Sequence, residues 1–369
     1  MECGDKDLEA FDLRERNVMS IRPLMSAAIR FAIALPVFVI VALFAGRAQA
    51  QGALVLYCTV QEEWCRVMVT AFERETGIKV AMTRKSSGEF YAQVKAEATN
   101  PRGDVWWGGT GDPHLQAAEE GLTQEYESPM NKELNDWAIS QWKASNKRTI
   151  GVYAGALGYS YNTDFMKKKG GAEPKCWADL LDPRFKDDVQ VADPNASGTS
   201  YTMLATIVQL MGEDKGFDYL KKMHKNVNQY TKSGAAPAKA ASLGESLIGI
   251  TFQHDAVVMA VQGAPVKIVS PCEGTGYEIG SMSIIKGAKN LDNAKKWYDW
   301  SLTAAAQSLG TKASVSYQVP SNKGAFLPEK SPRLGDIKLI NYDFVKYGSS
   351  AERKRLLTKW DAEVKNLPK

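Results

Sequence analysis

The chain has few of the residues on which metal centres and nucleophilic catalysis depend. Its 369 residues include three histidines and five cysteines. It contains no G-x-S-x-G motif, no pair of metal ligands at helical spacing and no phosphate-binding P-loop. Lysine and arginine exceed aspartate and glutamate by only four, and these charges are interspersed along the chain. A nucleic-acid-binding stripe is therefore excluded, and neither a cofactor nor a resident metal is expected.

Long apolar runs are also scarce, and the one that is present lies near the N-terminus. The uncharged run from Phe31 to Gly46 follows basic residues and precedes Ala48-Gln49-Ala50, a small-x-small cleavage pattern. It is shorter than the roughly 20 apolar residues of a membrane-spanning helix. We expect residues 1–50 to be an N-terminal extension and signal peptide, cleaved between Ala50 and Gln51, with the mature protein in the periplasm. An uncleaved N-terminal anchor is the alternative.

Four cysteines remain after that cleavage: Cys58, Cys65, Cys176 and Cys272. In an oxidising compartment an even number permits two disulfides, with three possible pairings. Cys58 and Cys65 are close in sequence across a strand-to-helix turn, so this is the first pair that we expect. Cys176 and Cys272 either form a second disulfide or are buried thiols.

Apolar spacing predicts alternating strands and helices. A short apolar strand at 54–57 precedes a helical pattern over 64–72, and an alternating strand follows at 78–82. Such β-α-β order predicts an α/β fold with a mostly parallel sheet covered by helices on both faces. The alternation restarts at 189–191, after an extended glycine-rich segment at 150–162. Two α/β units joined by extended crossovers would leave a ligand cleft between them.

Three stretches of small hydroxyl and glycine residues stand where helices are expected to begin. They are Ser86-Ser87-Gly88, Ser197-Gly198-Thr199 within the run 195–200, and Ser233-Gly234-Ala235. A helix start offers unpaired N–H groups and a partial positive charge, so it suits a small anion such as a phosphate ester.

The alternative is that these residues only cap their helices, and Ser86 with Glu89 reads as a capping box. Thr59, Gln61 and Thr110 follow strands at the expected cleft and offer further donors. No lysine or arginine lies inside the three starts, although Lys85 and Lys232 flank two of them. We therefore predict a phosphate site without a dedicated cation.

Four longer stretches give the chain a specific resemblance. The segments 71–80 (AFERETGIKV), 176–189, 193–202 and 276–300 together resemble the periplasmic substrate-binding proteins of ABC importers. The similarity is to the branch that contains ferric-ion binders and hexose-phosphate binders. It implies a two-lobed type II periplasmic binding protein with a hinge of two crossing strands, closing on its ligand.

The resemblance also implies an organisation and a partner. Residues 51–153 would form the first part of lobe 1 and residues 154–271 lobe 2. Residues 272–369 would return to lobe 1 and end in C-terminal helices. The implied partner is an ABC importer permease in the inner membrane, and we expect a monomer that binds no nucleic acid.

The residues at the family's ligand positions do not match those that bind a ferric ion. Ferric binders use an adjacent tyrosine pair, which is replaced here by His254 and Asp255. The family's early histidine is Gln61, and its glutamate is Gly109. The phenolates and both other characteristic ligands are therefore missing together.

The same positions resemble the hexose-phosphate-binding subgroup. His254, Asp255 and Glu273 can make paired hydrogen bonds with vicinal sugar hydroxyls. Each also has a simpler explanation: a core histidine, a helix cap and a hinge salt bridge, respectively. Trp106 and Trp107 are read either as a sugar-stacking pair or as buried core.

Other functions remain open at this point. A 2-aminoethylphosphonate binder would use the helix starts for the phosphonate and Asp255 or Glu273 for the ammonium group. A polyamine binder needs several carboxylates but no anion site. Cys65, His254 and Asp255 include the residue types of a nucleophile with its base. Adjacent His and Asp side chains diverge, however, and Cys65 opens a helix in the other lobe, so we do not expect an enzyme.

Overall fold

The computed structural model describes residues 52–368. The predicted signal peptide and its cleavage site at Ala50/Gln51 lie outside these residues. Within the described part, no helix combines the length and the apolar character needed to cross a membrane.

The first half of the chain forms the predicted β-α-β-α-β unit. Strand β1 (Ala53–Cys58) pairs in parallel with β2 (Lys79–Arg84) and β3 (Val105–Trp107). Helix α2 (Glu62–Thr76) buries its apolar side and ends at Gly77, whose φ of 72° suits glycine. Helices α3 (Ser87–Ala96) and α4 (Gly111–Glu119) begin directly after β2 and β3. Consequently the starts of these helices and the carboxyl ends of the strands lie at the same edge of the sheet.

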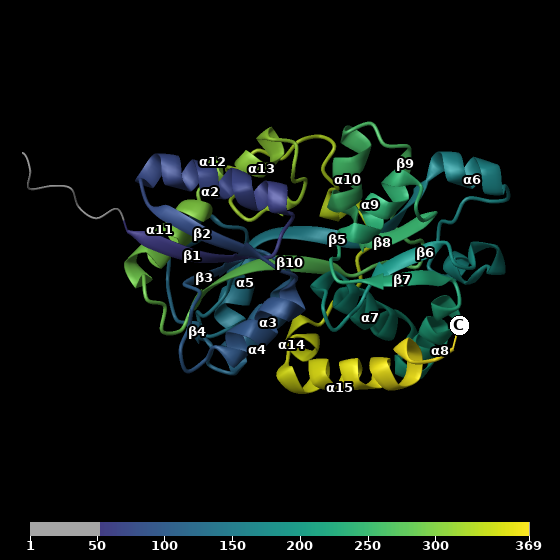
Figure 1. The fold of residues 1–369 in the computed structure, drawn as a ribbon, viewed down its shortest axis with the longest axis horizontal. Coiled ribbons are helices and arrows are strands. Elements are labelled where there is room, and N and C mark those ends of the chain that lie inside the picture. The colour runs from purple at the N-terminus through teal and green to yellow at the C-terminus, as the bar shows by residue number, and fades with distance from the viewer. Residues whose placement is uncertain (1–51, 369) are drawn as a thin grey trace, which may run out of the picture. The chain divides into compact units, whose positions relative to one another are not determined.

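Two long antiparallel strands connect the two halves of the molecule. In β5 (Ile150–Asn162), residues 150–156 pair with β10 (Tyr277–Ile285). The rest of β5 pairs instead with β8 (Ile248–Phe252) and β9 (Val266–Val269). One strand therefore passes from one lobe into the other beside β10, as the expected hinge of two strands requires (Figure 1).

The second lobe repeats the α/β alternation. Strand β6 (Val189–Ala192) pairs in parallel with β7 (Val227–Thr231) and with β8. The helices of this lobe are α6 (Thr163–Lys169), α7 (Gly198–Met211), α8 (Glu213–His224), α9 (Ala236–Leu243) and α10 (Gln253–Val261). In Figure 1, α9 and α10 lie above the sheet and α7 and α8 below it. The fold is the predicted two-lobed α/β class.

The remaining elements complete the two lobes. They are β4 (Thr123–Gln124), α5 (Asp136–Ala144), α11 (Leu291–Ser301), α12 (Ala304–Gln307), α13 (Leu309–Lys312), β11 (Val319–Pro320), α14 (Phe344–Tyr347) and α15 (Ser350–Trp360). One core contains Trp297 and Tyr298 of α11 together with β1 and α2. The other contains Leu356 and Trp360 of α15 together with α7 and α8. The C-terminal helix therefore packs on the second core, whereas the exact lobe boundaries at 153/154 and 271/272 stay predictions.

Both cysteine pairs are disulfides. Cys58 at the end of β1 bonds to Cys65 in the first turn of α2, which confirms the expected pair. Cys176 bonds to Cys272, so the thiol alternative for these two residues is wrong. The second bond ties the segment before β10 to the segment before β6, within the second lobe.

Candidate functional site

A polar pocket lies between the two lobes, where the strands end and the helices begin. The first lobe contributes the loop after β1 and the starts of α3 and α4. The second contributes the starts of α7 and α10 and the turn before α9, while β5 and β10 form the back. Twelve of the residues proposed from the sequence line it: Thr59, Gln61, Ser86, Ser87, Thr110, Ser197, Gly198, Thr199, Gly234, Ala235, His254 and Asp255.

Three proposed residues are not part of this lining. Ser233 lies just behind it and accepts a hydrogen bond of 3.4 Å from Arg84 Nη2. The backbone N–H of Gly88 donates to the carbonyl of Ala196, at 3.0 Å, so that N–H is not free for a ligand. Glu273 lies elsewhere.

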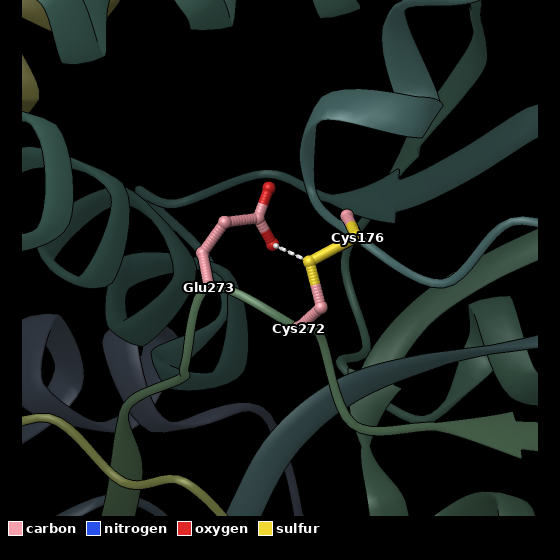
Figure 2. A group of neighbouring side chains, drawn as sticks. All are labelled: Cys176, Cys272 and Glu273. Carbon is pink, nitrogen blue, oxygen red and sulfur yellow. Dashed lines mark hydrogen bonds between the residues drawn. A yellow bond between two sulfur atoms is a disulfide. The ribbon is translucent and has the colours of Figure 1, made fainter.

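Glu273 supports a surface loop, which corrects its predicted role. Its carboxylate accepts the backbone N–H groups of Trp177 and Ala178 at 2.8 and 2.9 Å, and so caps a short 3-10 helix. Figure 2 shows it beside the Cys176–Cys272 disulfide, with a carboxylate oxygen 3.6 Å from the Cys272 sulfur. Since both sulfurs are in the disulfide, they are not thiolate ligands, and the cluster offers no metal site.

The carboxylate that does face the cleft is Glu278, five residues further along. It lies in the hinge strand β10 and is buried among the lining residues. Its Oε1 is 3.8 Å from Nε2 of His254. Because Glu278 is the only acidic residue of the otherwise uncharged strand YEIGSMSII, the cost of burying it was a signal that the sequence offered.

His254 and Asp255 open α10 and form a compact acid–base cluster with Glu278. Nε2 of His254 is 3.5 Å from Oδ1 of Asp255. Thr251 donates a hydrogen bond of 3.0 Å to Oδ2 of Asp255, and Gln61 donates to its other oxygen from the first lobe. Nδ1 of His254 is buried without a hydrogen-bond partner in the described residues. This nitrogen lies against Gly155 of β5, where a Cβ atom would collide with it, while Nε2 faces the two carboxyl groups.

Burial sets the protonation states of this cluster. It lowers the pKa of His254 to about 3, so the imidazole is neutral at neutral pH. Burial also raises the pKa of Asp255 to about 7 and raises that of Glu278 well above its ordinary value, with the Asp255 charge adding to the effect on Glu278. The three groups can thus donate as well as accept hydrogen bonds, which suits sugar hydroxyls.

The cleft also contains a cation, contrary to the prediction of a site without one. Arg84, the last residue of β2, lines the pocket and donates to the carbonyl of Val60 at 2.9 Å. Burial lowers the pKa of its guanidinium, and the nearby Asp255 carboxylate acts in the opposite direction. Lys85, by contrast, points to Gln93 on α3, at 2.7 Å.

The helix starts do more than cap their helices. The backbone N–H of Ser86 donates to the Glu89 carboxylate at 3.1 Å, and both hydrogen bonds of the predicted capping box are present. The hydroxyl of Ser86 also donates across the cleft to the carbonyl of Lys232, at 2.9 Å. Ser197 is the N-cap residue of α7 but makes no side-chain capping bond. The hydroxyl of Thr110 is buried without a partner, among the described residues.

Trp106 and Trp107 belong to the core rather than to the pocket lining. Trp106 stacks on His114 with ring centroids 3.8 Å apart, and its indole N–H donates to Thr59 Oγ1 at 2.9 Å. Trp107 packs edge-on against Trp64. The core interpretation of the tryptophan pair is therefore the one that the structure supports.

With fold and pocket established, the class of protein follows. Residues 110–346 match the family described as bacterial extracellular solute-binding protein. The chain belongs to this family, so it is a solute-binding protein of an ABC importer and not an enzyme.

Three proteins that are similar to this chain differ in their sequence identity and in the share of each chain that the similarity covers. The periplasmic binding protein AfuA of Actinobacillus pleuropneumoniae, solved with exogenous fructose 6-phosphate bound, is 44% identical with a TM-score of 0.83. The similarity covers 86% of this chain and 100% of that one. An uncharacterised Haemophilus influenzae protein is 47% identical over 87% of this chain and 93% of its own length. A putative 2-aminoethylphosphonate-binding periplasmic protein of Salmonella paratyphi A is 28% identical, over 70% of this chain and 75% of its own length.

Proposed function

We propose that this protein captures a hexose phosphate in the interlobe cleft and delivers it to the permease of an ABC importer. The observation that carries the proposal is the set of residues that line the pocket between the two lobes. Anion-binding groups and a buried hydroxyl-binding cluster line the same cleft. A phosphorylated sugar has the two chemistries that these groups match.

The phosphate is assigned to the serines, threonines and helix starts, together with Arg84. Ser87, Ser197 and Thr199 supply hydroxyls, and Gly198 allows the backbone to come close. A guanidinium adds paired N–H donors in a fixed plane, which fits phosphate oxygens. Hydroxyl and amide donors without the Arg84 guanidinium would bind a phosphate dianion less tightly than the same donors with it.

The sugar hydroxyls are assigned to His254, Asp255 and Glu278. A neutral imidazole and carboxyl groups with raised pKa values can donate to one hydroxyl and accept from the next. The bound fructose 6-phosphate in the similar AfuA protein supports the same ligand class. Inorganic phosphate would leave this cluster without partners, and buried groups without partners are costly.

A phosphonate is the second candidate, because Asp255 or Glu278 could hold an ammonium group. The similarity to a putative 2-aminoethylphosphonate-binding protein favours it. The neutral hydrogen-bonding cluster favours a ligand with several hydroxyls, however, since a single ammonium group cannot use all three side chains.

The ligand class is tested by thermal melts and calorimetry with five compounds. We expect fructose 6-phosphate and glucose 6-phosphate to bind, and to stabilise the protein by about 2.7 kcal/mol at 100 times the dissociation constant. Inorganic phosphate should bind more weakly, and ferric citrate should have no effect. The hexose-phosphate assignment is wrong if 2-aminoethylphosphonate raises the melting temperature and neither sugar phosphate does.

The sugar-binding role of Glu278 is tested against its neighbour Glu273. Glu278→Ala should weaken fructose 6-phosphate binding by about 1–3 kcal/mol, because it removes a hydrogen-bonding partner of the buried sugar hydroxyls. The affinity for inorganic phosphate should change little, because the phosphate contacts lie elsewhere in the pocket. Glu273→Ala should leave ligand binding unchanged but lower the melting temperature, because it removes the carboxylate that accepts the N–H groups of Trp177 and Ala178. Equal effects of both variants on the dissociation constant would contradict the assignment.

A further inference from the structure

The C-terminal helix α15 belongs by its packing to the second lobe. Leu356 and Trp360 are buried in the second core. On its outer side, Arg355 donates to the Glu213 carboxylate of α8 at 2.8 and 2.7 Å. Lys359 donates to the same carboxylate. In Figure 1, α15 (yellow) runs along the lower edge of the molecule, below α7.

Two residues of α15 cross to the first lobe. Ser350 at its start donates to Glu119 and Glu120 at the end of α4, and Arg353 contacts the buried start of α4. Its guanidinium forms an ion pair with Asp112, in the first turn of α4. Both side chains are almost completely buried, with 3% and 8% of their surface exposed. The guanidinium also lies over the ring of Tyr201 on α7, 4.1 Å from its centroid. The second lobe therefore holds the cation, and the first lobe holds the anion.

The ion pair lies directly behind the ligand pocket. Asp112 lies two residues after Thr110, the N-cap of α4. Thr110 lines the pocket and contacts Gly198 of the opposite lobe. The charge of Asp112 is close enough to contribute to the raised pKa of Glu278. A carboxylate buried at this place without a cation would be strongly unfavourable, and it would also repel an anionic ligand.

Separation of the lobes changes that balance. In an arrangement with α4 apart from α15, water would reach both charged groups, and neither would lose much by parting. When the lobes close, Asp112 is buried again and needs Arg353. The contact thus has different free energies in the two arrangements, which is the condition for an element that biases them.

We propose that Arg353 and Asp112 form an interlobe latch, an ion pair made on closure that stabilises the closed arrangement behind the ligand. The latch rests on the proposed function only for the choice of fructose 6-phosphate as probe. Arg353 is in this role a positioning residue, because it acts through Asp112 and α4. The alternative is an ion pair that only holds α15 in place and is present whether the lobes are open or closed.

The test is a double-substitution cycle with a matched control. The variants are Arg353→Gln, Asp112→Asn, the combination of both, and Arg355→Gln, which breaks an ion pair within the second lobe only. Calorimetry gives the dissociation constant for fructose 6-phosphate, and small-angle X-ray scattering without and with ligand gives the opening of the lobes. Arg353→Lys keeps the charge and serves if Arg353→Gln folds poorly.

We expect Arg353→Gln to weaken binding roughly 100-fold, because closure then buries an unpaired carboxylate. The double variant should regain at least about 10-fold of this loss, because the carboxylate is gone as well. With ligand present, scattering should show that the lobes of Arg353→Gln are more open than those of Arg355→Gln. The Arg355→Gln variant should scatter like the parent protein.

The latch is refuted if Arg353→Gln binds and scatters like Arg355→Gln, or if the double variant binds no better than Arg353→Gln. Failure of the parent protein to bind fructose 6-phosphate would refute the proposed function instead. In that case the same variants are compared with whichever of the five compounds above stabilises the parent protein, and their affinities and their scattering with that compound decide the latch.

Discussion

Replacing Gly198 by valine should abolish binding of hexose phosphate. Gly198 is the first residue of α7 in the second lobe, and a Cβ atom there would collide with the side-chain oxygen of Thr110 in the first lobe. Neighbouring carbons of Thr110 would be 2.9 Å away, closer than real Cβ contacts allow. The larger valine side chain would therefore hold the lobes apart and block the backbone at a helix start. We expect calorimetry to show a loss of at least about 1,000-fold, or roughly 4 kcal/mol.

Gly335→Val is the matched control for this substitution. Gly335 has open space around its Cβ position and no positive φ, so valine there should leave binding within about 2-fold of the parent protein. The ligand-free melting temperature of Gly198→Val should stay close to that of the parent protein, because open lobes can accommodate the side chain. Binding of Gly198→Val within 10-fold of the parent protein would contradict the close approach of the two lobes.

The fold followed from the sequence because its signals are local. The apolar spacing of α2, its stop at Gly77 and the alternation of strand and helix predict the β-α-β units directly. The pairing of β5 with both lobes joins residues that are far apart in the sequence, from 87 positions for Tyr161 and Ile248 to 132 positions for Ile150 and Met282. Only the family resemblance could supply that, and the exact residue boundaries of the lobes remain predictions.

The pocket-lining residues at helix starts were predicted because Ser, Thr and Gly mark those positions. Ser86, Ser197 and Thr110 all line the pocket. Glu278 was missed in favour of Glu273 because β10 is buried on both faces, so the strand shows no alternation that would indicate which side chain faces the cleft. A glutamate in the loop was then as plausible as one in the strand.

Arg84 was missed for a related reason. Strand β2 lies at the edge of the sheet and alternates between half-buried and exposed residues, so an arginine at its end resembles an ordinary surface cation. Only the approach of the second lobe, with Ser233 and Asp255, encloses it. Arg353 could not be predicted as an interlobe residue either, because 241 positions separate it from Asp112.

Replacing Arg84 by glutamine should weaken binding of every phosphorylated ligand. The substitution removes the guanidinium that lines the pocket and leaves Asp255 without its nearby cation. We expect both fructose 6-phosphate and inorganic phosphate to lose roughly 100-fold in affinity, since hydrogen bonds to charged groups contribute about 1.5–3 kcal/mol each. Arg84→Lys should recover only part of the loss, because an ammonium group lacks the paired N–H donors.

Lys85→Gln is the control, because Lys85 is the next residue but contacts Gln93 rather than the pocket. The affinity of Lys85→Gln for fructose 6-phosphate and for inorganic phosphate should stay within about 2-fold of that of the parent protein. A titration from low to high salt separates the two roles further, because buried interactions are screened far less than exposed ones. The difference between Arg84→Gln and the parent protein should therefore persist at high salt. If Lys85→Gln loses as much affinity as Arg84→Gln, or if high salt abolishes the difference, recognition depends on surface charge and Arg84 is not part of the phosphate site.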